Sequence, residues 1–212
     1  MKAVLVAGGK SPCKDILLEE LKNAHIIVCA DGGAKVLFQY KITPDILLGD
    51  FDSIDKEILN YYKNINANIK IYPPEKDYTD SEIAFNEILK IKDITEIVLL
   101  GCTGTRIDHL IGNLGLLYKG LMNSINVYIR DDNNLIFLTN KSVTLKRNFG
   151  NYISFQGFRE DVKDFSIKGA KYELYNHNLV LGDPLTICNE FLGNEIKIEF
   201  KNGVVMVIYS RD

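Results

Sequence analysis

From the N-terminus to about residue 131, short apolar runs alternate with segments of helical period. The apolar runs predict β-strands at residues 3–7, 26–30, 46–48, 69–72, 96–100 and 126–129. The segments between them predict helices near residues 13–21, 34–40, 56–62, 80–90 and 108–119. Strands that alternate with helices are typical of a parallel sheet covered on both faces. We therefore expect a doubly wound, Rossmann-like α/β sheet in this half.

After residue 133 the runs are short and strand-like, with no long helical period between them. The expected strands are residues 135–138, 142–145, 152–155, 165–167, 172–174, 179–181, 195–200 and 204–209. Lys201-Asn202-Gly203 predicts a hairpin turn between the last two, because Asn-Gly is a preferred hairpin centre. The second half is thus predicted to be an antiparallel β-sandwich or open barrel, with domains at residues 1–132 and 133–212.

Composition narrows the possible partners and compartment. A chain that is 46% hydrophobic and 25% charged is ordinary for a soluble globular protein. The net charge of -3 argues against a nucleic-acid-binding surface. The apolar run at residues 1–9 is too short for a signal peptide or a membrane span. The four cysteines lack the paired spacing of zinc sites. We expect a reduced, cytoplasmic protein with neither nucleic acid nor membrane as partner.

Four polar clusters each follow a predicted strand. They are Asp31-Gly32-Gly33-Ala34, Gly49-Asp50-Phe51-Asp52-Ser53, the run from Glu75 to Asp80, and the run from Gly101 to His109. Open α/β sheets bind ligands at the carboxyl ends of their strands. The clusters are therefore expected to meet at one edge of the sheet.

Asp50 and Asp52 are candidate ligands of a hard divalent cation such as Mg²⁺, which prefers oxygen ligands. The structural alternative is that Asp50, Asp52 and Ser53 form a turn and cap the next helix. The other clusters favour the cation. Carboxylates gathered at one edge repel one another, and a divalent metal with a polyphosphate resolves that repulsion.

Several cationic and small residues in the clusters suit phosphate. Gly32 and Gly33 let backbone amides approach an anion at a helix entrance, Lys76 is a point charge, and Arg106 offers a planar fork. Thr79 with Glu82 has the spacing of a helix capping box. In the helix near 108–119, the expected apolar stripe is Ile107, Leu110, Ile111, Leu114 and Leu117, and the expected polar face carries His109 and Asn113.

Phosphoryl or pyrophosphoryl transfer is therefore the leading chemistry. Gly8-Gly9-Lys10-Ser11 is not a P-loop, because Val4 stands where that motif needs glycine. We expect it to be a strand-end loop that approaches the nucleotide. Two rival functions stay open at this point. One is another magnesium-dependent enzyme, such as a sugar-nucleotide transferase that uses the Asp-x-Asp pair. The other is a non-catalytic nucleotide-sensing module.

The ordered set of motifs resembles the thiamine pyrophosphokinase family. The matching segments are Asp31-Gly32-Gly33-Ala34, Gly49-Asp50-Phe51-Asp52-Ser53, Lys76-Asp77-x-Thr79-Asp80, Gly101-x-x-Gly104-x-Arg106-x-Asp108-His109 and Cys188-Asn189-Glu190-Phe191. The resemblance implies an N-terminal α/β domain, a C-terminal β-sandwich and a homodimer with active sites at the interface. It also implies Mg²⁺, and transfer of the β,γ-pyrophosphate of ATP to the thiamine hydroxyl with release of AMP.

The resemblance also implies roles for single residues. Asp50, Asp52 and Asp80 look like the metal and catalytic carboxylates. The residues that look like nucleotide and polyphosphate contacts are Asp31, Gly32, Lys76, Asp77, Thr79, Thr103, Gly104, Arg106, Asp108 and His109. Thr186 and Asn189, supplied by the partner subunit, look like part of the thiamine pocket. The chain departs from the family at Cys188, where serine is common, and it has no tryptophan to stack on the pyrimidine.

Overall fold

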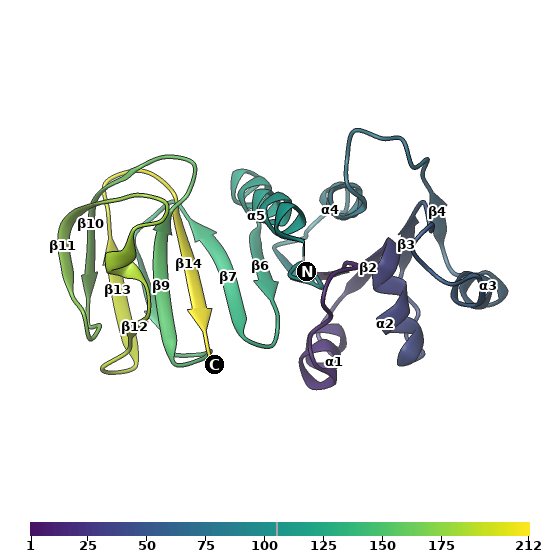
Figure 1. Cartoon of the computed structure of the whole chain (residues 1–212), viewed down its shortest axis with the longest axis horizontal. Coiled ribbons are helices and arrows are strands. Elements are labelled where there is room, and N and C mark those ends of the chain that lie inside the picture. The colour runs from purple at the N-terminus through teal and green to yellow at the C-terminus, as the bar shows by residue number, and fades with distance from the viewer. Residues whose placement is uncertain (105) are drawn as a thin grey trace. The chain divides into compact units, whose positions relative to one another are not determined.

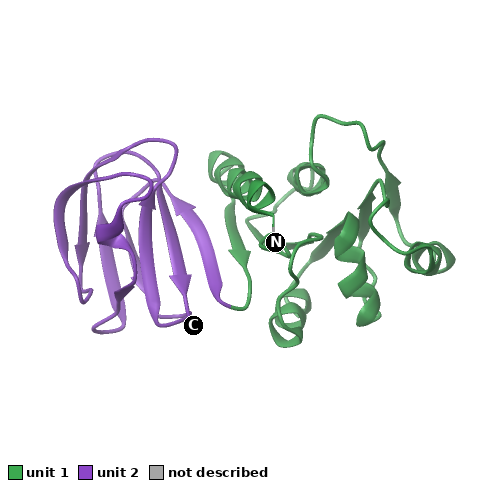
Figure 2. Cartoon of the chain, viewed as in Figure 1, with its two compact units in different colours: residues 1–132 green, residues 133–212 purple. Residues whose placement is uncertain are grey.

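Apolar strands and amphipathic helices alternate through the first 132 residues of the structure, a computed structural model that describes residues 1–104 and 106–212 (Figure 1). The chain forms two compact units, residues 1–132 and 133–212 (Figure 2). Each unit has its own hydrophobic core. Within the described residues, no helix combines the length and the apolar character needed to cross a membrane.

Six parallel strands form the sheet of the first unit, in the order β6-β5-β1-β2-β3-β4. The strands are β1 (Lys2–Val6), β2 (Ile26–Ala30), β3 (Ile46–Gly49), β4 (Ile69–Ile71), β5 (Glu96–Leu100) and β6 (Asn126–Arg130). The helices are α1 (Lys14–Lys22), the 3-10 turn η1 (Asp31–Gly33), α2 (Ala34–Gln39), α3 (Lys56–Asn64), α4 (Asp80–Leu89) and α5 (Ile107–Met122). The predicted doubly wound sheet is confirmed.

Helices cover both faces of this sheet. Figure 1 shows α1, α2 and α3 on one face and α4 and α5 on the other. Val4 and Val6 of β1 share a core with Leu17 of α1 and Leu37 of α2. Successive side chains of a strand point to opposite faces, so the intervening Leu5 lies on the other side, where it is also fully buried. Burial on both faces explains why the strands read as continuous apolar runs.

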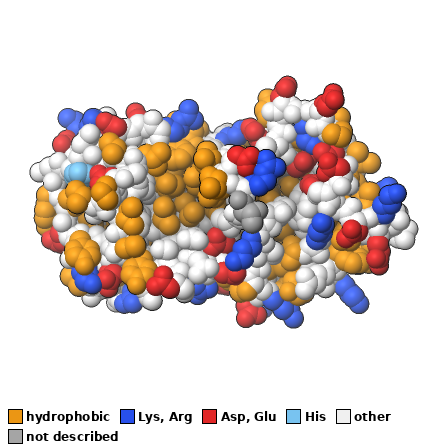
Figure 3. All heavy atoms as spheres, viewed as in Figure 1, with side chains coloured by type: hydrophobic (Ala, Val, Ile, Leu, Met, Phe, Trp, Pro, Cys, Tyr) orange, Lys and Arg blue, Asp and Glu red, His pale blue; other side chains and the backbone are white. Residues whose placement is uncertain are grey.

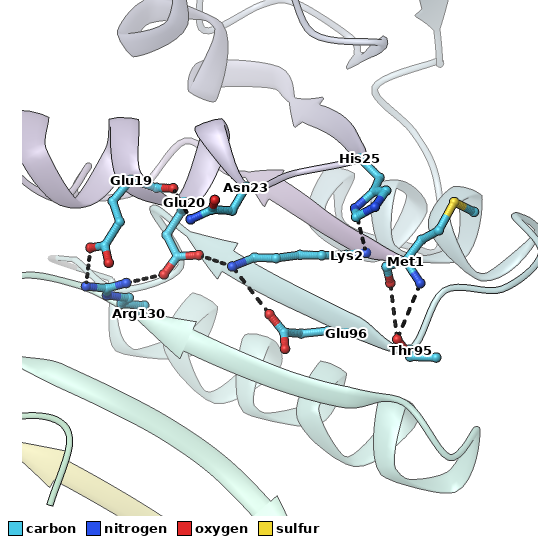
Figure 4. Close-up of polar contacts among 9 residues, drawn as sticks. All are labelled: Met1, Lys2, Glu19, Glu20, Asn23, His25, Thr95, Glu96 and Arg130. Atoms are coloured by element: carbon cyan, nitrogen blue, oxygen red, sulfur yellow. Dashed lines mark hydrogen bonds and ion pairs between the residues drawn. The ribbon is translucent and has the colours of Figure 1, made fainter.

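An ion-pair network joins α1 to strands β1, β5 and β6 (Figure 4). Glu20 of α1 is only 5% exposed, and its two carboxylate oxygens contact Lys2 and Arg130. The Lys2 ammonium lies 2.5 Å from Glu20 Oε2 and 3.3 Å from Glu96 Oε1. Arg130 Nη2 lies 2.8 Å from Glu19 Oε2. The cations therefore neutralise the one buried carboxylate at both of its oxygens.

The second unit is a sandwich of two antiparallel sheets, with strand orders β12-β9-β14-β7 and β11-β10-β13-β8. Its elements are β7 (Asn134–Thr139), β8 (Val143–Lys146), β9 (Tyr152–Gly157), β10 (Val162–Lys168), β11 (Leu174–Leu179), η2 (Pro184–Thr186), β12 (Asn189–Glu190), β13 (Glu195–Glu199) and β14 (Val205–Ser210). Phe155 of one sheet packs against Phe165 of the other, with ring centroids 5.6 Å apart. The predicted β-sandwich is confirmed.

The hairpin predicted at Lys201-Asn202-Gly203 is wrong. β13 and β14 belong to different sheets, so this segment crosses from one layer of the sandwich to the other. Gly203 has φ +105°, and a Cβ there would lie 3.0 Å from the Cα of Val162. The Asn-Gly signal thus marks a real backbone bend, but a local turn preference does not decide which sheet the next strand joins.

The strands predicted at residues 172–174 and 179–181 are also wrong as separate elements. One strand, β11 (Leu174–Leu179), occupies the space between them and forms the edge of its sheet. Its middle residues, Tyr175-Asn176-His177-Asn178, are mostly polar and exposed. An edge strand with little buried surface leaves almost no apolar pattern in the sequence.

The predicted apolar stripe of α5 is wrong in its first turns. Ile107 and Ile111 are 69% and 64% exposed, whereas Leu116 and Leu117 are buried. Asn113 was expected on a polar face but is buried, because its Nδ2 donates to the carbonyl of Cys102 at 2.9 Å. A satisfied amide can therefore face the protein while isoleucines face outward.

Candidate active site

The loops after β1, β2, β3 and β5, with the start of α4, surround a cavity of about 520 Å³ in the first unit. All these strands are parallel and end at the same edge of the sheet, which is where ligands bind in such folds. The predicted site residues that line the cavity are Asp31, Gly32, Asp50, Asp52, Thr79, Asp80, Thr103, Gly104, Arg106 and His109. The polar clusters thus meet as their order along the chain predicts.

Three carboxylates converge on one point of this cavity. One carboxylate oxygen each from Asp31, Asp50 and Asp52 lies within 4.8 Å of the other two. Asp31 Oδ2 accepts a hydrogen bond from the Ser53 hydroxyl. The other oxygen, Oδ1, is buried and has no hydrogen-bond partner among the described residues. An unpaired buried carboxylate oxygen beside two further carboxylates is a strong attractor for a cation.

Glycine 49 makes this convergence possible. It has φ +153°, and a Cβ at this position would lie 3.0 Å from the Cβ of Asp31. The chain then turns through Phe51, which has φ +62° and is buried, while Asp50 and Asp52 on either side line the cavity. A larger residue at position 49 would push the loop after β3 away from the loop after β2, which carries Asp31. The glycine therefore sets the spacing of the carboxylates.

Lys76 bridges Asp50 to Asp80, the first residue of α4. Its ammonium lies 3.2 Å from Asp50 Oδ2 and 3.0 Å from Asp80 Oδ1. Thr79 caps the helix by accepting a hydrogen bond from the Glu82 N–H at 3.2 Å. Of the two hydrogen bonds that a capping box predicts, only this one is present among the described residues. The Glu82 carboxylate, which would accept from the Thr79 N–H, instead contacts Lys119 at 3.1 Å.

The neighbouring charges give these carboxylates different proton affinities. Burial raises the pKa of Asp50, but the hydrogen bond from the Asp52 N–H and the charge of Lys76 outweigh it, and the pKa falls below its ordinary value. The charge of Asp50 raises the pKa of Asp52. Burial raises the pKa of Asp80, and Lys76 offsets only part of that increase. Asp50 is thus the most acidic of the three.

The loop after β1 is held against the loop after β5. The Gly9 N–H donates to the carbonyl of Gly101 at 2.8 Å, and the Lys10 N–H donates to that of Thr103 at 2.8 Å. A Cβ at Gly9 would lie 2.4 Å from both of these carbonyl oxygens, so only glycine fits there. The two loops therefore form one rim of the cavity with little side-chain bulk, which lets a ligand approach the backbone.

Two side chains that can donate hydrogen bonds to an anion stand where α5 begins. Arg106 and His109 line the cavity, and both are exposed. The Arg106 guanidinium forms a two-point pair with Asp108, with Nη2 to Oδ2 at 2.6 Å and Nε to Oδ1 at 3.2 Å. This pairing lowers the pKa of Asp108. A planar fork beside the positive end of a helix is suited to phosphate oxygens.

Comparison with known proteins identifies the family. The model for "Thiamin pyrophosphokinase, catalytic domain" matches residues 17–129, and that for "Thiamin pyrophosphokinase, vitamin B1 binding domain" matches residues 140–205. The chain belongs to the thiamine pyrophosphokinase family. Thiamine pyrophosphokinase of Bacillus subtilis (strain 168) is 33% identical over 216 residues, which cover 100% of both chains.

Solved structures of the family share the fold. A crystal structure of thiamine pyrophosphokinase from Bacillus subtilis has a TM-score of 0.90 at 32% identity and covers 100% of both chains. That of a thiamin pyrophosphokinase family protein from Enterococcus faecalis has a TM-score of 0.87 at 26% identity, again over 100% of both. The predicted family and its activity class, an ATP-dependent thiamine diphosphokinase, are confirmed, and the sugar-nucleotide transferase alternative gains no support.

Some residues predicted from the thiamine pyrophosphokinase resemblance lie outside the cavity lining. Lys76 contacts Asp50 and Asp80 but is not itself part of the lining, Asp77 is exposed outside the lining, and Asp108 pairs with Arg106. Gly8 and Gly9, from the loop expected to approach the nucleotide, line the cavity. The other lining residues were missing from the predicted site set, namely Ala7, Ala30, Ser53, Ser81, Gly101, Cys102 and Asn113. Ser53 belongs to the Gly-Asp-Phe-Asp-Ser motif itself, so its neighbours could have indicated it.

The two residues predicted to contact thiamine are buried in the second unit. The Thr186 hydroxyl donates to the carbonyl of Phe155 and lies 3.5 Å from Gln156 Nε2. Asn189 Nδ2 donates to the Tyr172 carbonyl at 2.7 Å, and its Oδ1 accepts from the Tyr172 N–H at 3.0 Å. In this thiamine pyrophosphokinase family member, both side chains use their hydrogen-bonding groups within the fold.

Proposed function

We propose that the cavity of the first unit is where this protein transfers the pyrophosphoryl group of ATP to the hydroxyl of thiamine. The observation that carries the proposal is the convergence of Asp31, Asp50 and Asp52 in one cavity with glycine-rich loops and Arg106. Carboxylates repel a triphosphate unless a cation stands between them. Groups for the cation and groups for the anion therefore lie together, as pyrophosphoryl transfer requires.

The same three carboxylates fit Mg²⁺. Each offers a hard oxygen ligand, and the buried Oδ1 of Asp31 has no other partner among the described residues. When bound, the ion supplies positive charge against the triphosphate oxygens and orients the β-phosphorus for in-line attack. The grouping supports Asp31 as a ligand beside Asp50 and Asp52, in the place that the sequence prediction gave to Asp80.

Asp80 is better suited to accept the proton of the thiamine hydroxyl. It lines the cavity at the start of α4, and burial raises its pKa. A carboxylate with increased proton affinity is a better general base than an ordinary aspartate. Lys76 holds the carboxylate in place through the contact of 3.0 Å. In this arrangement Asp31, Asp50 and Asp52 bind the cation, and Asp80 accepts the proton of the thiamine hydroxyl.

The nucleotide is proposed to lie along the glycine-rich rim. Gly32, Thr103 and Gly104 line the cavity with little bulk, and Arg106 and His109 provide side-chain donors for phosphate oxygens. Asp108 orients the Arg106 fork through the two-point pair. Asp77 lies outside the cavity lining, so nothing in the geometry supports its predicted nucleotide contact.

The second unit is proposed to contribute the thiamine pocket. Thr186 and Asn189 act there by holding the segment between them, because their polar groups are already paired. The side chains on this segment that reach the surface are Ile187, 51% exposed, and Cys188. An apolar residue and a small thiol offer a surface for an aromatic ring rather than for a charge.

A homodimer is proposed because large apolar side chains are exposed at the surface of the chain, where Figure 3 shows hydrophobic side chains in orange. On α5 these are Ile107, Ile111 and Met122, and on the second unit Leu181 and Leu192 are 70% and 74% exposed. Ile107 and Ile111 are four residues apart and so share one face of α5, and an exposed apolar face of this kind favours an interaction surface. A cytoplasmic location is proposed as well, since all four cysteines are free thiols.

The proposal is tested by incubating the protein with ATP, Mg²⁺ and thiamine and detecting products by mass. We expect AMP and thiamine diphosphate in equal amounts, and neither product when thiamine is omitted. ATP labelled in the β-phosphate should carry its label into the thiamine product. A nucleotide-sensing module would bind ATP without consuming it, and the absence of thiamine-dependent AMP would contradict the proposal.

A further inference from the structure

The Lys76 ammonium lies between two carboxylates at the edge of the cavity. Its ammonium lies 3.2 Å from Asp50 Oδ2 and 3.0 Å from Asp80 Oδ1. The Lys76 side chain is 12% exposed, and those of Asp50 and Asp80 are 13% and 22% exposed. A positive charge held this closely, with this little access to water, belongs to the charge balance of the cavity.

The segment around Lys76 is fixed at both ends. The Tyr72 N–H donates to the carbonyl of Gly49 at 3.0 Å, which ties the segment to the end of β3. Pro73 and Pro74 follow and restrict the backbone. Thr79 caps α4 at the other end. The ammonium therefore reaches Asp50 and Asp80 from a constrained loop, although residues 75–79 themselves belong to no helix or strand.

Asp50 is shared between two groups of carboxylates. It forms one group with Asp31 and Asp52, and its Oδ2 forms the other with Asp80. A divalent ion needs carboxylate oxygens at about 2.0–2.6 Å, a distance that the ammonium at Asp50 Oδ2 prevents. Repulsion between an ammonium and a divalent ion is also twice that between two single charges at equal distance.

We propose that Lys76 is a built-in counter-cation that sets the metal count of the cavity. It excludes a divalent ion from the Asp50–Asp80 position and leaves one site at Asp31, Asp50 and Asp52. The inference rests on the metal site of the proposed function. This role of Lys76 does not require the nucleotide, because the groups that the ammonium contacts are protein carboxylates.

The test counts Mn²⁺ ions on the protein alone, without ATP or thiamine, by electron paramagnetic resonance of the unbound ion. Mn²⁺ takes the same oxygen ligands as Mg²⁺ and is directly countable. We expect one ion on the wild type and two on Lys76→Met, with Lys76→Gln as a second neutral variant should the first fail to fold. The Lys76→Arg variant keeps the positive charge and should bind one Mn²⁺ ion.

Two further variants locate the extra ion. Asp80→Asn in the Lys76→Met background should return the count to one, because it removes half of the second position. Lys70→Met is the matched control, since Lys70 forms an ion pair with Glu87 at 2.5 Å outside the cavity, and it should bind one ion. Equal counts of one on the wild type and on both neutral variants would overturn the role of Lys76. A count of zero on every variant would instead overturn the proposed metal site.

Discussion

Two clusters of charge in the first unit are differently balanced. In the network of Figure 4, both carboxylate oxygens of Glu20 contact a cation, one from Lys2 and one from Arg130. In the cavity, a single ammonium, that of Lys76, contacts Asp50 and Asp80, while Asp31 Oδ1 has no partner among the described residues. The first cluster satisfies its buried carboxylate, and the second leaves negative charge in excess.

The difference separates a structural role from a functional one. A buried carboxylate that is fully paired contributes to stability, because removing it strands its partners. A cluster with excess negative charge costs stability by repulsion, and such a cost persists where a ligand relieves it. The same chemical change, a carboxylate replaced by its amide, should therefore have opposite effects on folding in the two clusters.

Asp50→Asn is expected to have the largest effect of all, on activity. Asp50 belongs to the three-carboxylate group and also contacts Lys76, so the amide weakens the metal site and its charge balance. We expect the rate of AMP formation to fall by about a thousandfold, the scale for losing one group that stabilises transition-state charge. Asp55→Asn is the control, because Asp55 is exposed and outside the cavity lining. Full activity of Asp50→Asn and Asp52→Asn would contradict the assignment.

Glu20→Gln should give the largest loss of stability. The amide leaves Lys2 and Arg130, whose side chains are 20% and 19% exposed, without their shared carboxylate. We expect the free energy of unfolding to fall by about 3 kcal/mol, at the lower end for a broken buried pair. Glu96→Gln is the matched control, since Glu96 is 38% exposed and makes one contact, at 3.3 Å, worth about 0.5 kcal/mol. Urea unfolding measures both, and equal losses would show that pairing of the buried carboxylate is not what matters.

Asp52→Asn should instead raise the melting temperature of the magnesium-free protein at pH 7. The charge of Asp50 raises the pKa of Asp52 in the folded state, so the folded protein binds this proton more tightly than the unfolded chain does. Stability is therefore lost as the pH rises through the folded pKa, and the amide removes that loss. Below the ordinary aspartate pKa of 3.8, Asp52 is protonated in both the folded and the unfolded wild type. The difference in melting temperature between the variant and the wild type should then disappear.

Saturating Mg²⁺ provides the control for that prediction. The ion binds the folded wild type and stabilises it, whereas Asp52→Asn has lost one of its ligands. The advantage of the variant should thus shrink or reverse when Mg²⁺ is added. Calorimetric scans with and without the ion measure this, and a variant that melts below the wild type in both would contradict the repulsion argument.

The α/β sheet could be predicted from sequence because its strands are buried on both faces. Short, mainly apolar runs such as residues 26–30 and 96–100, separated by segments of helical period, favour buried parallel strands, and both strands have those bounds in the structure. The sandwich was harder to predict at its edges. β11 is an edge strand of mostly polar residues, and the segment at Asn202-Gly203 changes sheets, which depends on partners far away in sequence.

The position of the site could be predicted from the order of the strands, but the contacts between its charged side chains could not. That Asp31 and Asp50 end neighbouring parallel strands places them together. Which carboxylate Lys76 contacts depends on the path of a loop without regular structure, and sequence spacing does not specify that path. Asn113 was missed for a similar reason, since its partner is a backbone carbonyl that no pattern of side chains reveals.

The exposed pair of Arg106 and Asp108 should contribute least to stability. Their side chains are 67% and 64% exposed, so water screens the two-point contact, and neither Arg106→Ala nor Asp108→Asn should change the urea midpoint of unfolding measurably. Activity should separate the two variants. If Arg106 contacts phosphate oxygens, its removal raises the KM for ATP about tenfold, the scale of one charge-assisted hydrogen bond. Asp108→Asn keeps the guanidinium and should raise the KM less. Equal increases would mean that the pair, rather than the arginine, is what the nucleotide requires.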